Sequence, residues 1–150
     1  CSSDLTKTVE AHYHSYEEGM AAAKAQGKPV LIDFTGFGCV NCRKMEAAVW
    51  TDPTVADMLN NQYVLISLYV DDKTPLAEPV EVSLNGQQQT LRTVGDKWSY
   101  LQASKFGANA QPYYIAIDND GRPLNHAYGF KEDVAAYIDY LQQGLKTYRR

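Results

Sequence analysis

The chain has 150 residues, of which 45% are hydrophobic and 21% charged, and its formal net charge is -4. This length suits one domain, with a core large enough to fold without a metal or disulfides. The acidic balance argues against nucleic acid as a partner, because phosphate binding needs clustered lysine and arginine. No apolar run approaches the roughly 20 residues of a membrane-spanning helix.

The first part of the chain shows no regular period. We therefore expect residues 1–14 to be a leader or linker and residues 15–150 to form one domain. The chain begins with Cys1 rather than methionine. Cys1 could be the lipid-carrying first residue of a processed lipoprotein or a simple fragment boundary, and both interpretations stay open.

Helical and strand patterns alternate along the domain, which predicts an α/β fold with helices on both faces of a central sheet. The first helix is marked by the capping-box pair Ser15 and Glu18 and by Gly27 at its end. The predicted elements, in chain order, are a helix at 16–26, a strand at 30–34, a helix at 41–49, a short helix from Asp52-Pro53, a strand at 63–70, a helix at 97–106, strands at 113–117 and 124–128, and a helix at 132–146. A short turn joins the last two strands, so the sheet must be mixed rather than wholly parallel.

An insertion at about residues 72–97 interrupts the alternation of strands and helices. Within it, residues 80–94 alternate around Asn85-Gly86, which is the strongest short signal for a β-hairpin. We therefore expect the insertion to contain a hairpin.

Cys39 and Cys42 lie between the first predicted strand and the helix that follows it. A zinc site would need about four ligands, and the rest of the chain offers no second ligand pair at finger or ribbon spacing. A structural disulfide over so short a loop would remove little chain entropy. A redox pair fits better, because a cysteine at a helix N-terminus faces backbone N–H groups that stabilise a thiolate. Cys39 should be the exposed nucleophile and Cys42 the more buried resolving thiol.

The segment PVLIDFTGFGCVNCRKME, residues 29–46, resembles the active-site segment of the thioredoxin superfamily. In particular, it resembles the C-terminal periplasmic domain of the DsbD family of membrane thiol:disulfide interchange proteins. The shared points are the G-K-P-V run, the C-V-x-C centre and Glu46. Residues 109–130 resemble the part of that family that holds a cis-proline. The resemblance implies a thioredoxin fold, with a mixed central sheet covered by helices on both faces.

Two acids are candidate catalytic residues. Asp33 is a misfit in an apolar strand, and it matches the buried acid of thioredoxins. It could carry protons to and from Cys42, whereas the ordinary alternative is an acid bonded to backbone at a strand end. Glu46 matches a family glutamate, but it could equally be a surface residue of a helix.

Four further residues are candidates for substrate binding, and two of them, Gln111 and Pro112, are implied by the resemblance. Pro112 should be cis and should expose the backbone of Gln111 to an extended substrate segment. Without the resemblance, a trans proline at a strand start would be the simpler interpretation. Phe37 and Tyr113 could form an apolar rim around Cys39, although core packing is a fair alternative for Tyr113.

The chain also departs from the thioredoxin pattern. It has Gly38 where thioredoxins have tryptophan, and Val40-Asn41 where they place a proline. Ser67 lies about where the lysine that pairs with the buried acid would be. These differences bear on substrate identity and reduction potential rather than on the redox chemistry.

Together these features predict a thiol:disulfide oxidoreductase domain that is periplasmic or otherwise extracytoplasmic and membrane-tethered in the full-length protein. It should need no metal and no cofactor besides the redox-active disulfide. By resemblance, a membrane-embedded donor would supply electrons, and disulfide-containing periplasmic proteins would receive them. The acids near the pair disfavour a thiolate, which predicts a reductase with a potential nearer roughly −270 mV than roughly −120 mV. The alternative is a non-catalytic thioredoxin-like module that holds client peptides through the insertion and the edge at Pro112.

Overall fold

The structure is a computed structural model, and it describes residues 9–149. Most of the predicted helices and strands are present, with small shifts at their ends. In chain order the elements are α1 (Tyr16–Gln26), β1 (Val30–Thr35), α2 (Val40–Ala48), α3 (Pro53–Asp57), the π-helical turn η2 (Met58–Gln62), β2 (Val64–Tyr69), β3 (Pro75–Leu84), β4 (Gln87–Thr93), α4 (Val94–Phe106), β5 (Tyr113–Ile117) and α5 (Val134–Tyr148).

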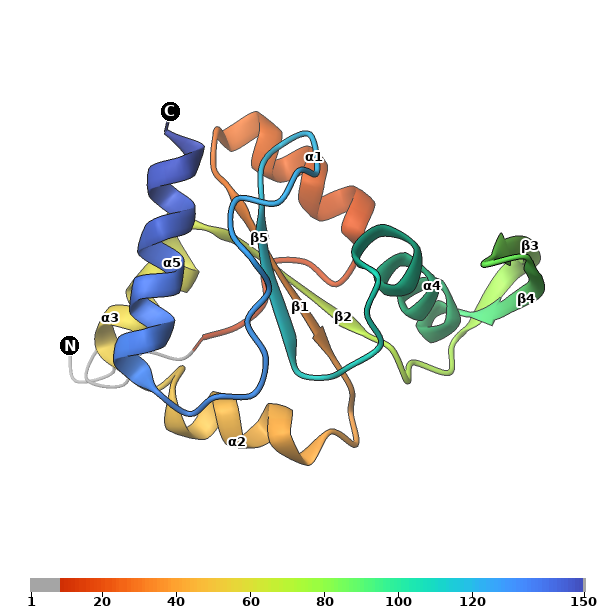
Figure 1. Cartoon of the computed structure of the whole chain (residues 1–150), viewed down its shortest axis with the longest axis horizontal. Helices are drawn as coiled ribbons and strands as arrows, with labels where there is room; N and C mark the ends of the chain where they lie inside the picture. The colour runs from red at the N-terminus through yellow and green to blue at the C-terminus, as the bar shows by residue number, and fades with distance from the viewer. Residues whose placement is uncertain (1–8, 150) are drawn as a thin grey trace.

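The central sheet has the strand order β2-β1-β5 and runs through the middle of the molecule (Figure 1). β1 pairs with β2 in parallel and with β5 antiparallel. This confirms the prediction of a mixed sheet in an α/β fold. Because β5 is antiparallel, its first residue lies beside the end of β1, where the chain turns toward the cysteines.

Helices cover both faces of the sheet (Figure 1). Alternate residues of the strands point to opposite faces, so each face has its own apolar cluster. One face packs against α1 and α4, with Ile32, Phe34 and Trp98 among its buried residues. The other packs against α2, α3 and α5, with Leu31 and Met45 among its buried residues. Asp33 projects toward this second face, because it alternates with Ile32 and Phe34.

The insertion forms a separate two-stranded sheet, β3-β4, which extends beyond α4 (Figure 1). Its turn residues are the predicted pair, Asn85 with φ 54° and Gly86 with φ 80°. Positive φ at both positions is what a two-residue hairpin turn requires, and it explains why asparagine and glycine occupy them. The predicted hairpin is therefore confirmed.

The strand predicted at residues 124–128 is wrong as a continuous strand. Two isolated bridges, at Ile117–Pro123 and Tyr114–Tyr128, join this segment to β5, together with a hydrogen bond from the N–H of Leu124 to the carbonyl of Ala116 at 2.8 Å. Between them, the Asn125 side chain accepts a hydrogen bond from the N–H of His126 at 2.9 Å and its amide group points to the carbonyl of Tyr140 at 3.4 Å. These local side-chain bonds take the place of a regular ladder.

Part of the predicted leader lies against the sheet. The N–H of His12 donates to the carbonyl of Leu65 at 2.8 Å, and Tyr13 forms a parallel bridge with Ile66. The ring Nδ1 of His12 accepts the N–H of Leu65 in return. Residues 9–14 thus add a contact at the β2 edge, while residues 1–8, with Cys1, lie outside the described residues.

Helix α4 begins at Val94, earlier than the expected start at residue 97. The hydroxyl of Thr93 accepts the N–H of Asp96 at 3.1 Å, and the carboxylate of Asp96 accepts the N–H of Thr93 at 3.2 Å. This reciprocal pair is a capping box, and it starts the helix directly where the hairpin ends.

Replacing the cap tests this account of α4. Thr93→Ala should lower the free energy of unfolding by about 1 kcal/mol, because it leaves the N–H of Asp96 without its acceptor. Urea unfolding followed by circular dichroism measures the loss. Ser104→Ala, on the exposed side of the same helix, is the matched control and should stay within about 0.5 kcal/mol of the parent. Equal stability of the two variants would contradict the capping role.

Candidate redox site

Cys39 is the N-cap of α2, and it forms a disulfide with Cys42, with 5.3 Å between the two Cα atoms. The Sγ of Cys39 accepts a hydrogen bond from the N–H of Cys42 at 3.2 Å. The helix therefore directs a backbone donor at the sulfur that would carry negative charge after reduction. Within residues 9–149, no three metal-ligating side chains gather at one point.

The two cysteines differ in their exposure to solvent. Cys39 is half-buried, whereas Cys42 lies inside α2 with 1% of its surface exposed. This agrees with the expected order, in which the first cysteine meets the substrate and the second lies beneath it. Their roles as nucleophile and resolving thiol remain predictions.

Asp33 lies in the middle of β1, between Ser67 of β2 and Tyr114 of β5. It is 2% exposed. Its Oδ2 accepts the hydroxyl of Ser67 at 3.1 Å, and its Oδ1 has no hydrogen-bond partner among the described residues. Burial raises the pKa of Asp33 to about 7, with the Ser67 bond acting in the opposite direction and the negative charge of Glu46 adding to the rise. Ser67 thus supplies a neutral donor to this carboxyl group.

Glu46 is held by Arg43, one helical turn before it, with 3.2 Å between Nη2 and Oε2. The same guanidinium nitrogen donates to the hydroxyl of Thr35 at 2.9 Å and to the carbonyl of Gly36 at 3.2 Å. Burial raises the pKa of Glu46, and the charge of Arg43 only partly offsets this. Arg43 thereby links α2 to the end of β1, a role that sequence analysis did not assign to it.

A cluster of aromatic rings forms the interior below Asp33. Tyr114 and Tyr137 meet edge to face, with 5.3 Å between ring centroids. The indole N–H of Trp50 donates to the hydroxyl of Tyr137 at 3.2 Å. The rings of Tyr128 and Tyr140 pack against one another in the same cluster. These rings exclude water from the inner side of the sheet, which is why the carboxyl group of Asp33 resists ionisation.

The Gln111-Pro112 peptide bond is cis, as the resemblance implied. The segment before it is held by Gln102 of α4, a fully buried polar residue. The Nε2 of Gln102 donates to the carbonyl of Ala110 at 2.9 Å, and its Oε1 accepts from the side chain of Gln111 at 3.1 Å. Sequence analysis missed Gln102, although a polar residue one turn after the buried Trp98 was an available signal.

The two predicted rim residues differ in their surroundings. Phe37 is 63% exposed, and its ring stacks on Tyr69 with 4.1 Å between centroids. Tyr113 is half-buried, and its ring packs against Phe34 and Phe106 on the α4 side of the sheet. The ring of Phe37 is thus accessible to a binding partner. The ring of Tyr113 is partly enclosed by core residues, as the alternative interpretation expected.

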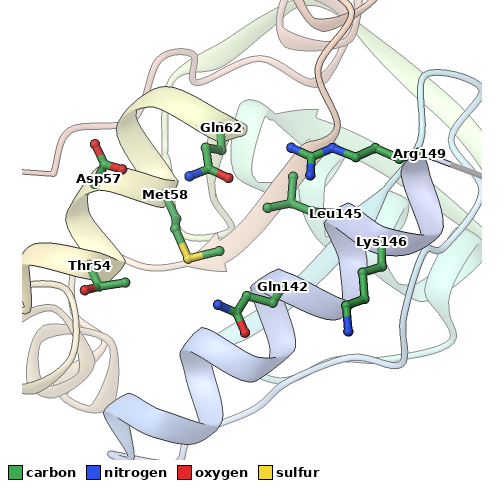
Figure 2. A pocket seen from close by; sticks show the side chains of 8 residues that line it. All are labelled: Thr54, Asp57, Met58, Gln62, Gln142, Leu145, Lys146 and Arg149. Carbon is green, nitrogen blue, oxygen red and sulfur yellow. The ribbon is translucent and has the colours of Figure 1, made fainter.

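A separate cavity of about 440 Å³ lies between two helical segments, α3-η2 and α5 (Figure 2). Side chains from both segments face one another across it, and they include amides and charged groups of both signs. The lining residues are Thr54, Asp57, Met58, Gln62, Gln142, Leu145, Lys146 and Arg149. None of the predicted site residues lines this cavity, so it is not part of the redox site.

Alkylation of the reduced protein tests the order of the cysteines. Iodoacetamide should modify Cys39 at least about tenfold faster than Cys42, because a half-buried thiol at a helix N-terminus reacts faster than an enclosed one. Tandem mass spectrometry locates the label, and urea-unfolded protein is the control in which both should react alike. Faster labelling of Cys42 would reverse the proposed roles.

Asp33 should make stability depend on pH. Its pKa is about 7 in the fold and 3.8 in a free side chain, so the folded state binds the extra proton between these values. The contribution of Asp33 is fully present below pH 3.8 and is lost as the pH rises through about 7. Asp33→Asn should remove this loss, gaining on the order of 4 kcal/mol relative to the parent between pH 4 and pH 8. The variant should also slow disulfide exchange.

Unfolding in urea at several pH values measures the Asp33 effect. Asp139→Asn, at an exposed position of α5, is the control and should run parallel to the parent. Parallel curves for Asp33→Asn as well, or a variant that does not fold, would contradict the account.

Three comparisons with known proteins agree with this geometry. A model of the thioredoxin-like family matches residues 11–91. Among curated relatives, the thiol:disulfide interchange protein DsbD of Vibrio vulnificus strain CMCP6 is 33% identical over 95% of this chain and 21% of its own length. DsbD of Pseudoalteromonas atlantica is 31% identical over 69% of this chain and 19% of its own length. The chain thus spans about a fifth of the length of these relatives.

The fold is similar to that of solved thioredoxin-like structures. The C-terminal domain of DsbD from Neisseria meningitidis, in its reduced form, aligns with a TM-score of 0.58 and 18% identity, covering 88% of this chain and 98% of that domain. The relatives and the fold agree with the resemblance of the Cys39–Cys42 segment to a thioredoxin-like site. The family match covers more than half of the sequence, and the chain belongs to the thioredoxin-like family.

Proposed function

We propose that this chain is a thiol:disulfide oxidoreductase domain that exchanges disulfides through Cys39 and Cys42. The observation that carries the proposal is the disulfide at the N-terminus of α2, with its outer sulfur accepting a backbone N–H and its inner residue buried. A disulfide that closes so short a loop contributes little to stability. Its position at a helix N-terminus is better explained by thiol–disulfide exchange.

The exchange begins when the Cys39 thiolate attacks one sulfur of a substrate disulfide. A mixed disulfide forms, and the other substrate sulfur leaves as a thiolate that takes up a proton. Cys42 then loses its proton and attacks the Sγ of Cys39, which releases the second substrate thiol. The domain ends as the Cys39–Cys42 disulfide, and the substrate has gained two electrons and two protons. A donor dithiol restores the reduced pair by the reverse sequence.

Asp33 and Glu46 are the proposed acid–base groups. Asp33 is buried beneath α2 on the face of the sheet that carries Cys42, and a carboxyl group that titrates near neutral pH can accept the proton that Cys42 must lose. Glu46 adds a second carboxyl group near Asp33, because its charge contributes to the raised pKa of Asp33. The negative charge of Glu46, joined by that of Asp33 once it ionises above about pH 7, opposes the build-up of negative charge at the pair, which favours a reductase over an oxidase.

The proposed setting follows from the relatives. We assign the domain to the periplasm or another extracytoplasmic space, tethered to the membrane in the full-length protein. A membrane-embedded donor would supply electrons, disulfide-containing periplasmic proteins would receive them, and no cofactor besides the disulfide is needed. Within the part of the chain that the structure describes, no helix has the length and apolar character to cross a bilayer. Phe37, Gln111, Pro112 and Tyr113 are the proposed substrate contacts.

Trapping the intermediate tests this function. In a Cys1→Ser background, Cys42→Ser should accumulate a mixed disulfide between Cys39 and a protein substrate, because the attack that releases the substrate is lost. Non-reducing electrophoresis and mass spectrometry with reduced-state controls detect the adduct. Cys39→Ser should form none, and it should not accelerate insulin reduction beyond dithiothreitol alone.

The alternative function, a non-catalytic thioredoxin-like binding module, predicts different results in the same experiments. A non-catalytic client-binding module would bind unfolded peptides equally well with and without Cys39, and the parent would not accelerate insulin reduction. Finding both results would replace the oxidoreductase proposal with the binding module.

A further inference from the structure

Asp71 contacts the loop that leads into Cys39. It follows β2 and stands at the start of the insertion, far from the cysteines in sequence. Its Oδ1 accepts the N–H of Phe37 at 2.8 Å, and its Oδ2 accepts the N–H of Gly38 at 3.1 Å. One carboxylate thus binds two successive backbone donors directly before the nucleophile.

The same loop is held from its other side. Arg43 donates to the carbonyl of Gly36 at 3.2 Å, and the N–H of Cys39 donates to that carbonyl at 3.3 Å. A Cβ atom at Gly36 would lie 3.2 Å from the carboxylate of Asp71, tighter than an ordinary contact. Residues 36–38 are therefore fixed between an anion and a cation, and glycine at 36 permits the close approach.

Asp71 is an effective acceptor because it is charged. Partial burial opposes ionisation, but the N–H groups of Phe37 and Gly38 outweigh it and hold the pKa of Asp71 below its usual value. Hydrogen bonds to an ionised acceptor are stronger than those between neutral groups.

The fixed loop determines where the Phe37 ring lies. That ring stacks on Tyr69, two residues before Asp71, yet it remains 63% exposed. Gly38 has no side chain to contribute, so Phe37 is the aromatic group that the loop presents beside Cys39. An exposed ring held in one position binds an apolar partner at low entropic cost.

We propose that Asp71 is a positioning residue that fixes residues 36–38 so that Phe37 is presented beside Cys39 to polypeptide disulfides. The proposal rests on the proposed exchange function. It predicts discrimination between substrate classes, because a polypeptide with an apolar side chain near its cysteine can use the ring, whereas a small aromatic disulfide reagent reaches the sulfur without needing the positioned loop.

Kinetics with two substrates test the positioning role in the full 150-residue chain. The rate constant for insulin, divided by that for 5,5′-dithiobis(2-nitrobenzoic acid), should fall about fivefold in Asp71→Ala. Asp72→Ala is the matched control, since it removes the same charge and one backbone hydrogen bond, from the N–H of Thr74 on the insertion side. The ratio should not change in the control. An unchanged ratio in Asp71→Ala, or an equal fall in both variants, overturns the proposal.

A double-mutant cycle tests whether Asp71 acts through Phe37. Phe37→Ala alone should lower the insulin ratio, and Asp71→Ala should add little to it when the ring is already absent. Two independent losses that multiply in the double variant would overturn the proposal.

Amide resonances of Phe37 and Gly38 give a readout that does not depend on activity. In the parent they should shift as Asp71 titrates at acidic pH, and in Asp71→Ala this titration should vanish and the amide protons should exchange with solvent faster. Amides that behave alike in both proteins overturn the positioning contact. If the parent reduces neither substrate while the amides respond as expected, the exchange function fails and the contact stands, but the substrate role assigned to Asp71 falls with that function.

Discussion

A single carboxyl group, Asp33, is buried in the central strand, and much of the site follows from how the fold accommodates it. An ionised acid at this depth needs a cation or several donors. Ser67 offers one neutral donor, and the guanidinium of Arg43 is bonded to Thr35, Gly36 and Glu46 instead. The tyrosine cluster beneath excludes water. The group is therefore stable in its protonated form up to about neutral pH, which is the property that the proposed proton exchange with Cys42 requires.

Two opposing electrostatic effects act on the thiolate of Cys39. The N-terminus of α2 stabilises negative charge on the outer sulfur through the N–H of Cys42. Against this, the amides of Phe37 and Gly38 are bonded to Asp71 rather than to the sulfur. The negative charge of Glu46, which acts on Asp33, is joined by that of Asp33 above about pH 7. Strong oxidants of this kind depend on a highly stabilised thiolate, and this arrangement stabilises it only in part. This balance is the physical basis of the proposed reductase direction.

Local chemistry could be predicted from the sequence, but long-range contacts could not. Short sequence patterns were enough to predict the end of α1 at Gly27, the turn at Asn85-Gly86 and the strand β1. Asp33 was noticeable because it is a charged residue within the apolar run of β1. The prediction of a continuous strand at 124–128 failed because the Asn125 side chain bonds the N–H of His126 and the carbonyl of Tyr140 in α5, where a regular strand ladder was expected. Asp71 acts on Phe37 and Gly38, which lie 34 and 33 residues before it, so no local pattern marked its targets.

The central claim is that the arrangement of acids around Cys39 and Cys42 makes this domain an electron donor to protein disulfides. The equilibrium reduction potential of the pair tests it most directly, measured by alkylation and mass spectrometry after incubation in graded glutathione and dithiothreitol buffers. The account predicts a value near roughly −270 mV, as in thioredoxin, whereas a value near roughly −120 mV, as in the strong oxidant DsbA, would contradict it.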